Sequence, residues 1–360
     1  MSHNSLLRVT VPALFAGLFT VMSAGLFGNP AGLQAADAAP AAEWQDISGA
    51  FTQQLGADGS GQVFTRRCVG MAVVPSGEIF MLTSAKGICV SADQGATWTV
   101  AENNHATGRC ETDFDMSVAY PYDGRLAFFA IDGTGGITLD GGRSWRPFAR
   151  IRRNFEFADL DWQRPEPQTV FGLTHEPYFR ALSADGGRTW KQLTETQTQQ
   201  DCLGVVDAAT LVRASYNVPG ISLSSDGGQS WAEVAAYRVL GRRPTHYGKQ
   251  VYWTTTEGVI VSSNGKDWTL TGKGPEGADF GPYFGASDQE FMVVSRTAFS
   301  LTRDGGKTWK EVARSFAPPE MFRGPRVNQA GHFNYFGWDP KRDLLYASGI
   351  GGSIYKLQVQ

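Results

Sequence analysis

One short motif, Ser/Thr-x-Asp-x-Gly-x-x-Trp or a close variant, recurs six times along this chain. Successive motif tryptophans are 47, 45, 41, 37 and 41 residues apart. A period of this length is typical of a four-stranded propeller blade rather than of a helical repeat. The acidic or amide residue and the tryptophan of the six copies are Asp93 and Trp98, Asp140 and Trp145, Asp185 and Trp190, Asp226 and Trp231, Asn264 and Trp268, and Asp304 and Trp309.

The motif has the composition of a tight turn between the two outer strands of a blade. Its aspartate can accept backbone N–H bonds inside the turn, and the following glycine supplies a positive φ. Its tryptophan is expected to cover the hairpin and fill the wedge between neighbouring blades. The fifth copy is one residue shorter and has Asn264 in place of aspartate. Because a site that is used once would not need six copies, we interpret these residues as structural.

The strand pattern predicts the number of blades. Three further strands are expected after the sixth motif, at residues 334–338, 344–348 and 353–357, with no motif to complete a fourth. Residues 43–48 could supply that strand, since an open ring would leave an unpaired blade edge. We therefore predict one all-β domain over residues 39–360, a seven-bladed propeller of four-stranded antiparallel blades closed by its N-terminal strand. Six blades with a tail is the alternative.

Residues 1–38 resemble an export signal. Arg8 precedes an apolar run at 11–27, and small residues end in Ala36-Asp37-Ala38. The run is short for a membrane span. We expect cleavage after Ala38, with an earlier cut near Ala24 as the alternative. We expect a periplasmic or secreted monomer with no stable membrane span, an uncleaved anchor being the alternative. The net charge of −3 gives no field that would attract a nucleic acid.

Four cysteines suit an oxidising compartment and allow three pairings. Cys68 and Cys89 fall on the first and third strands of one predicted blade, about 9–10 Å apart, which is too far for a disulfide. We prefer a pairing of Cys68 with Cys110. Buried free thiols remain the alternative for these residues and for Cys202.

The repeats resemble those of BNR or Asp-box propellers, and the resemblance covers nearly all of residues 39–360. That superfamily includes sialidases, xyloglucan-cleaving hydrolases, sortilin-type receptors and the photosystem II stability and assembly factor family. The copies at 183–190 and 302–309 are similar to the Ser-x-Asp-Gly-Gly-x-x-Trp form of the last family. The resemblance implies a propeller with a scaffold or chaperone-like role, and it does not identify the partner.

A sialidase-like activity is not predicted. Sialidases carry an Arg-Ile-Pro element on the first blade and an aspartate acid/base in the loop that follows. Arg67 matches the arginine, but Cys68 and Val69 replace the isoleucine and proline, and the loop at residues 84–87 has no aspartate. Without that acid the chemistry lacks its proton donor. Xyloglucan hydrolases of this class resemble two propellers in tandem, for which the chain is too short.

Propeller topology predicts which loops can bind. The motif turns should lie on one face, here called the motif-turn face. The connections between blades and between second and third strands should lie on the other, here called the loop face. Arginines and aromatic residues gather there and suit carboxylates, sulfates or an acidic protein segment. The candidate binding residues are Arg67, Arg109, Arg152, Arg153, Tyr178, Arg180, Tyr216, Arg323 and Arg326. Scattered solvated arginines are the alternative.

An enzyme is the competing hypothesis, in the form of a lyase, a hydrolase or a metal-dependent oxidoreductase at the same channel mouth. His105, His175 and His332 map to the loop face but lack a metal-binding spacing, so we predict no metal and no cofactor. Several carboxylates near the channel could do acid/base work. They are Asp113, Asp115, Glu156, Asp159, Asp161 and Glu176. The more favoured function is a binding or assembly module for an envelope protein or an anionic ligand.

Overall fold

The computed structural model describes residues 43–55, 68–84, 86–102, 104–108, 118–152, 154–195, 200–275, 277–295, 298–314, 335–348 and 353–359. The chain divides into two units, Met1–Ala41 and Ala42–Gln360. The first unit, with the predicted export signal, lies outside the described residues. In the described part, no helix has both the length and the apolar character needed to cross a bilayer.

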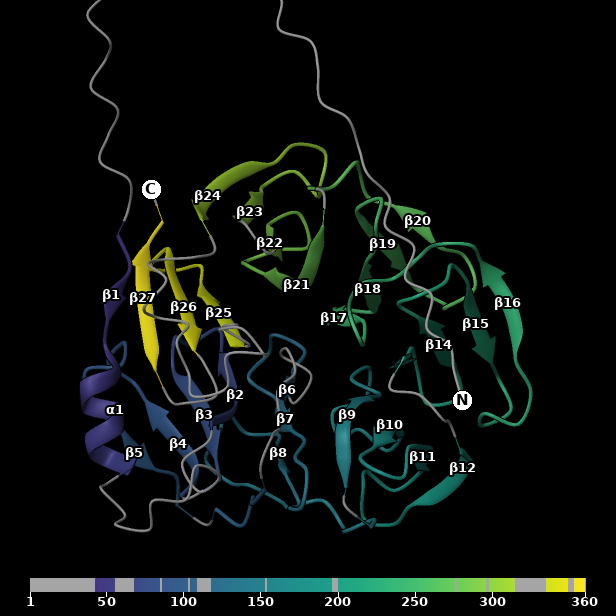
Figure 1. The fold of residues 1–360 in the computed structure, drawn as a ribbon, viewed down its shortest axis with the longest axis horizontal. Helices are drawn as coiled ribbons and strands as arrows, with labels where there is room; N and C mark the ends of the chain where they lie inside the picture. Colours follow the sequence, from purple (N-terminus) through teal and green to yellow (C-terminus); the bar gives the residue numbers. More distant parts are fainter. Residues whose placement is uncertain are drawn as a thin grey trace, which may run out of the picture. The chain divides into compact units, whose positions relative to one another are not determined.

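Seven antiparallel sheets form the blades of a propeller (Figure 1). Blade 1 contains β2 (Cys68–Val73), β3 (Ile79–Thr83), β4 (Gly87–Ser91) and β5 (Thr99–Val100). Blade 2 contains β6 (Val118–Ala119), β7 (Leu126–Phe128) and β8 (Gly136–Thr138). Blade 3 contains β9 (Phe155–Leu160), β10 (Val170–Thr174), β11 (Phe179–Ser183) and β12 (Lys191–Glu195). Blade 4 contains β13 (Asp201–Val205), β14 (Leu211–Ser215), β15 (Ile221–Ser224) and β16 (Ala232–Ala235).

The remaining blades complete the ring. Blade 5 contains β17 (Thr245–Tyr247), β18 (Gln250–Thr254), β19 (Val259–Ser262) and β20 (Thr269–Leu270). Blade 6 contains β21 (Ala278–Phe284), β22 (Phe291–Ser295), β23 (Ala298–Thr302) and β24 (Lys310–Arg314). Blade 7 contains β25 (Tyr335–Asp339), β26 (Leu344–Ser348), β27 (Ile354–Gln358) and β1 (Gln45–Asp46). The prediction of seven blades is confirmed, and the six-bladed alternative is wrong.

The N-terminal strand closes the ring, as predicted. β1 pairs antiparallel with β27, with Gln45 opposite Lys356 and Asp46 opposite Tyr355. The Ile47 amide extends the pairing to the Ile354 carbonyl at 2.9 Å. In blade 2 the fourth strand is reduced to a single bridge between Ile137 and Arg146. The outer edge of that blade is therefore short, which limits unwanted pairing with another chain.

A helix follows the closing strand, and the sequence pattern did not predict it. α1 (Ser48–Leu55) begins after Asp46, whose carboxylate accepts the Ser48 amide at 2.8 Å. Phe51 of this helix is fully buried and its ring lies 4.7 Å from that of Trp98. The helix therefore covers the first motif turn and joins blade 7 to blade 1 (Figure 1).

The motif turns share one set of hydrogen bonds. In blade 3 the Ser183 hydroxyl donates to Asp185 at 2.7 Å and accepts the Gly187 amide at 2.8 Å. The Asp185 carboxylate also accepts the amide and the hydroxyl of Thr189, at 2.8 and 2.6 Å. Gly187 has a φ of 80°, and an added Cβ would lie 2.4 Å from the Phe148 ring. In the short fifth turn, Asn264 Oδ1 accepts the backbone amide of Asp267 at 2.9 Å. The side-chain oxygen of asparagine therefore takes the place of the aspartate carboxylate.

The motif tryptophans pack as predicted. The Trp145 ring of blade 2 lies 5.9 Å from Phe80 of blade 1, and the Trp231 ring of blade 4 lies 6.0 Å from Phe171 of blade 3. Most indole N–H groups donate to the glycine carbonyl of their own turn. Trp190 instead donates to the Ala149 carbonyl at 2.8 Å, which ties blade 3 to the preceding connection. These contacts fill the wedges between blades with aromatic surface.

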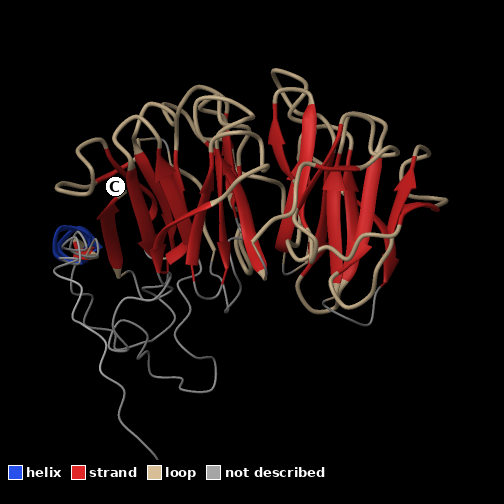
Figure 2. Ribbon diagram, turned by 90° about the horizontal axis from the view of Figure 1, so that it is seen from above, coloured by secondary structure: helices blue, strands red, loops and turns tan. Residues whose placement is uncertain are grey.

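Alternating strand direction separates the two faces (Figure 2). Each inner strand runs toward the motif-turn face, the second strand returns, and the third ends in a motif turn. The second-to-third turns and the connections between blades therefore lie on the loop face. The inner strand of blade 3, β9, is buried along its whole length and places carboxylates at both ends.

Candidate functional site

The loop face brings four of the predicted binding residues into one region. Arg152, Tyr178 and Tyr216 come from the connections of blades 2 to 4, and Arg180 lies near the start of β11 in blade 3. The other five predicted residues, Arg67, Arg109, Arg153, Arg323 and Arg326, lie outside the described residues. Contacts between these four residues and their neighbours hold the region together.

Arg152 lies in a tight connection between blades 2 and 3. The Ile151 amide donates to Asn154 Oδ1 at 2.8 Å, and the Asn154 amide donates to the Ile151 carbonyl at 2.7 Å. Arg152 and Asn154 both have a positive φ, of 48° and 62°. This conformation is uncommon outside glycine, and asparagine tolerates it better than most residues. It directs the exposed Arg152 side chain onto Phe179, with 5.2 Å between the guanidinium carbon and the ring centroid.

Arg180 is already paired with an acid. Its Nε and Nη2 atoms lie 2.8 and 2.9 Å from the two carboxylate oxygens of Asp201. Both side chains are only 14% exposed, so solvent screens this ion pair weakly. Arg213 lies within range of the Arg180 charge. Burial, and then that charge, lower the pKa of Arg213. Arg213 also lies over the ring of Trp231, at 4.5 Å.

Two arginines extend this region onto blades 4 and 5. The guanidinium carbon of Arg242 is 4.2 Å from the centroid of the Tyr216 ring. The Nε of Arg238 donates to the Tyr216 carbonyl at 2.9 Å, and Nη1 of Arg242 donates to the Asp201 carbonyl at 3.5 Å. We use the term arginine cluster for Arg152, Arg180, Arg213, Arg238 and Arg242.

The predicted binding residues did not include four residues of this region, Arg213, Arg238, Arg242 and Asp201. Arg242 lies in a connection between blades, the same topological position that identified Arg152, and that position could have revealed it. Asp201 begins an inner strand, and nothing local in the sequence marks it as the partner of Arg180. The region therefore includes one buried acid, Asp201, that compensates part of the arginine charge and that the predicted set did not contain.

A buried histidine–glutamate pair lies beside the cluster. Nδ1 of His175 contacts Oε1 of Glu156, and the two residues are 2% and 8% exposed. The ring of Tyr178 meets the His175 ring edge-on at 6.1 Å. A carboxylate on Nδ1 fixes the orientation of the imidazole, an arrangement that can serve structure or proton transfer.

The predicted alternative metal ligands do not form a centre in the described residues. There, no three His, Cys, Asp or Glu side chains come together in a geometry that could hold a metal ion. His105 and His175 are among those residues, and His332 lies outside them. His246 lies on β17, where Nε2 is 2.9 Å from Oδ2 of Asp159.

Two carboxylates at the motif-turn end of β9, Asp159 within the strand and Asp161 just after it, differ in their surroundings. Asp159 is fully buried and accepts the Val205 amide at 2.9 Å in addition to its contacts with His246. It thereby joins the inner strands of blades 3, 4 and 5. Asp161 lies at the motif-turn end of the same strand and lacks this set of partners. Of the remaining candidate acids, Glu176 is exposed on the loop face, whereas Asp113 and Asp115 lie outside the described residues.

Two of the cysteines are buried thiols of low reactivity. Cys89 and Cys202 are buried free thiols. Burial raises the pKa of Cys89 to about 11 and that of Cys202 to about 12. Cys68 and Cys89 lie on β2 and β4 with β3 between them, as expected. The preferred pairing of Cys68 with Cys110 stays a prediction, because Cys110 lies outside the described residues.

Comparison with known proteins identifies the fold. No family model and no curated protein matches the sequence. The GH74 enzyme of Niastella koreensis matches with a TM-score of 0.53 and 14% identity over 82% of this chain and 44% of that one. A structure of YCF48 bound to D1 peptide matches with a TM-score of 0.47 and 15% identity, over 90% of this chain and 96% of that one. YCF48 from Cyanidioschyzon merolae matches with a TM-score of 0.44 and 13% identity, over 88% of this chain and 98% of that one. The chain spans less than half of the GH74 enzyme, and the likeness to that enzyme is one of fold, the β-propeller.

Proposed function

We propose that this chain is an exported, non-catalytic binding or assembly module whose arginine cluster holds an anionic partner. The observation that carries the proposal is the placement of Arg152 and Arg242 on aromatic rings, 5.2 and 4.2 Å from the ring centroids. Stacking orders a guanidinium before binding, so less entropy is lost when it pairs with a carboxylate. Flat anions and acidic protein segments are the ligands that this geometry favours.

The proposed partner is an acidic envelope protein segment, or a small anionic ligand, that spans blades 3 to 5. Arg180 orders the middle of this surface through Asp201, while Arg152 and Arg242 flank it on either side. Residues 1–38 are proposed as the export signal, which would place the protein in the periplasm or outside the cell as a monomer. A scaffold or chaperone-like role follows from binding without chemistry.

A labelled acidic peptide tests this proposal. We expect the peptide to bind the wild-type chain, and the double variant Arg152→Glu/Arg242→Glu to bind it about tenfold or more weakly, since each charged hydrogen bond is worth about 1.5–3 kcal/mol. Arg143→Glu is the matched control, because Arg143 is an exposed arginine on the motif-turn face. Fluorescence anisotropy at fixed salt measures the affinities. Equal weakening by the control variant would refute a specific surface.

A periplasmic enzyme is the second candidate, and the Glu156–His175 pair favours it. A carboxylate-oriented imidazole next to arginines could move a proton to or from an anionic substrate. A metal-dependent form of this hypothesis would use His105, His175 and His332. Metal analysis of the purified protein, together with an activity screen comparing wild type with His175→Gln, distinguishes the two functions.

A further inference from the structure

The first-to-second strand connection of blade 3 is the longest of the seven on the motif-turn face. It runs over residues 161–169, between the end of β9 at Leu160 and the start of β10 at Val170. The corresponding connection of blade 4 runs over 206–210, and that of blade 5 over 248–249. A blade can be closed by the shorter turns, so the additional residues are open to another role.

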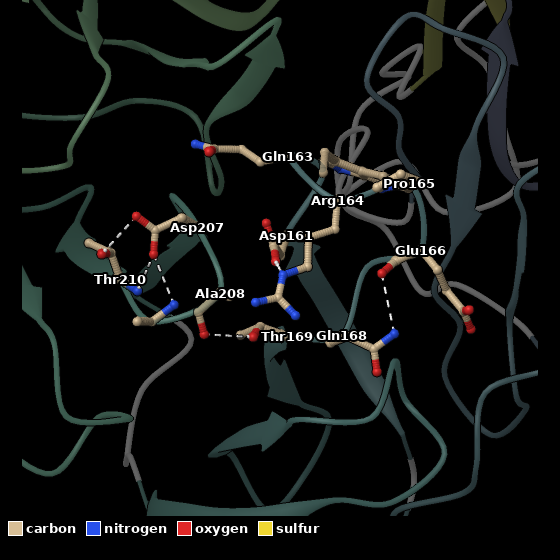
Figure 3. A network of polar contacts seen from close by, with 12 residues as sticks. Asp161, Gln163, Arg164, Pro165, Glu166, Gln168, Thr169, Asp207, Ala208 and Thr210 are labelled. Atoms are coloured by element: carbon tan, nitrogen blue, oxygen red, sulfur yellow. Dashed lines mark hydrogen bonds and ion pairs between the residues drawn. The ribbon is translucent and has the colours of Figure 1, made fainter.

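Several contacts hold this connection in place, and Figure 3 shows the one between Thr169 and Ala208. Arg125 of blade 2 donates to the carbonyls of Trp162 and Arg164, the first at 2.9 Å. Its guanidinium also lies 5.5 Å from the Trp162 ring. On the other side, the hydroxyl of Thr169 donates to the Ala208 carbonyl of blade 4 at 2.9 Å. The connection is thus fastened to both neighbouring blades.

Asp161 is buried in this connection without a matching set of donors. Its side chain is 1% exposed, and neither carboxylate oxygen makes a hydrogen bond of ordinary geometry within the described part of the chain. Its nearby cation is Arg164, whose Nε lies 3.3 Å from Oδ2 while the Arg164 side chain is 54% exposed. Asp159, two residues earlier, has both His246 and the Val205 amide.

The electrostatic surroundings of Asp161 favour a cation. Burial raises the pKa of Asp161 and the charge of Arg164 lowers it. The Gln163 backbone amide also lowers this pKa, Asp207 of blade 4 raises it, and the charge of His246 lowers it. The Asp207 carboxylate accepts the amides of Ala209 and Thr210, each at 2.9 Å, and so stays fixed beside the site. Figure 3 shows Asp161 facing the guanidinium of Arg164, with Asp207 nearby.

We propose that Asp161 anchors a binding site for an organic cation, an alkylammonium or alkylguanidinium group, on the motif-turn face. The ligand replaces Arg164, which turns toward solvent at small cost because an ion pair with an exposed side chain is weak. Several N–H donors on one cation can satisfy both oxygens of a buried carboxylate, which a single Nε does not. The site is independent of the arginine cluster and lies on the opposite face.

Titration with n-butylguanidinium chloride at constant ionic strength tests the proposal, with thermal unfolding and tryptophan fluorescence as readouts. We expect saturable binding to the wild-type chain. Removal of the competing side chain in Arg164→Ala should lower the dissociation constant about two- to fivefold. Asp161→Asn should abolish binding and still fold, since it removes a buried charge. Glu166→Gln, which changes an exposed acid of the same connection, is the matched control and should bind as wild type does.

Absence of saturable binding to Arg164→Ala, or undiminished binding to Asp161→Asn, would overturn the proposal. N-acetyl-arginine amide and a capped arginine tripeptide separate the two sources of the cation. Tighter binding of the tripeptide indicates a protein side chain as the natural ligand, and equal binding indicates a small molecule. Both results retain the cation site.

Discussion

The two faces of this propeller are built in opposite ways. On the motif-turn face one pattern of hydrogen bonds recurs: Asp185 in blade 3 and Asp304 in blade 6 each accept an amide and a hydroxyl from within their own turn. On the loop face no such pattern recurs: Arg152 lies over Phe179, Arg180 pairs with Asp201, and Arg242 lies over Tyr216. Repetition marks residues that build blades, and departure from repetition marks residues that are available for a specific task.

Loss of a motif tryptophan should have the largest effect on stability. Trp98 is 5% exposed and packs against Phe51, so Trp98→Ala should lower the free energy of unfolding by about 3–5 kcal/mol. The control is Val218→Ala on the loop face, where the side chain is 58% exposed and the change should stay within about 0.5 kcal/mol. Urea unfolding measures both. Similar losses in the two variants would remove the contrast between the faces.

Loss of a turn carboxylate should have an intermediate effect. Asp185→Ala removes the acceptor for Ser183 and Thr189, and we expect a loss of about 1 kcal/mol after solvent screening is taken into account. Asp185→Asn should cost less, because Asn264 already fills the same role in the fifth turn. Chemical denaturation of both variants checks the order. An equal loss in the two would show that charge, rather than the acceptor atom, stabilises the turn.

Acid should weaken the motif turns. Hydrogen bonds from the hydroxyl and the amide of Thr308 lower the pKa of Asp304 to about 2, against about 4 in an unfolded chain. The folded-state pKa is depressed, so this stabilisation is complete above about pH 4 and is lost as the pH falls toward 2. Unfolding measured from pH 6 to pH 2 should show a shallower decline for Asp304→Asn than for wild type. Parallel curves would contradict the role of this carboxylate.

Charge reversal on the loop face should have the smallest effect on stability. Arg152 is exposed and contacts the Phe179 ring, so Arg152→Glu should change the free energy of unfolding by no more than about 0.5–1 kcal/mol. Thermal unfolding beside the peptide-binding assay separates stability from binding. A loss as large as that of Trp98→Ala would make this face structural as well.

The fold was largely predictable because its determinants repeat. The spacing of the motif tryptophans predicted the blade period, and the leftover strands after Trp309 predicted closure by residues 43–48. The helix α1 was missed because eight residues with no charged ends carry little local signal. Its position depends on the contact between Phe51 and Trp98, which joins segments far apart in the chain.

The candidate site was predictable only in outline. Topology placed Arg152 and Arg180 on the loop face, but the pairing of Arg180 with Asp201 depends on how blades 3 and 4 meet. Asp159 and Asp161 lie on the same side of the same segment and are alike in local sequence. Their difference arises from their hydrogen bonds: Asp159 contacts Nε2 of His246 and accepts the Val205 amide, whereas His246 acts on Asp161 only through its charge.

The most direct test of the functional account is the recovery of a partner from the cell envelope. The chain from Ala39, where we propose that the export signal ends, would be expressed with an affinity tag in its native host, crosslinked gently and analysed by mass spectrometry. The Arg152→Glu/Arg242→Glu variant and the Arg143→Glu control would be treated in parallel. The account predicts one stoichiometric protein that wild type and control retain and the double variant loses. Equal recovery by all three, or a monomer that carries a metal or small molecule instead, would contradict it.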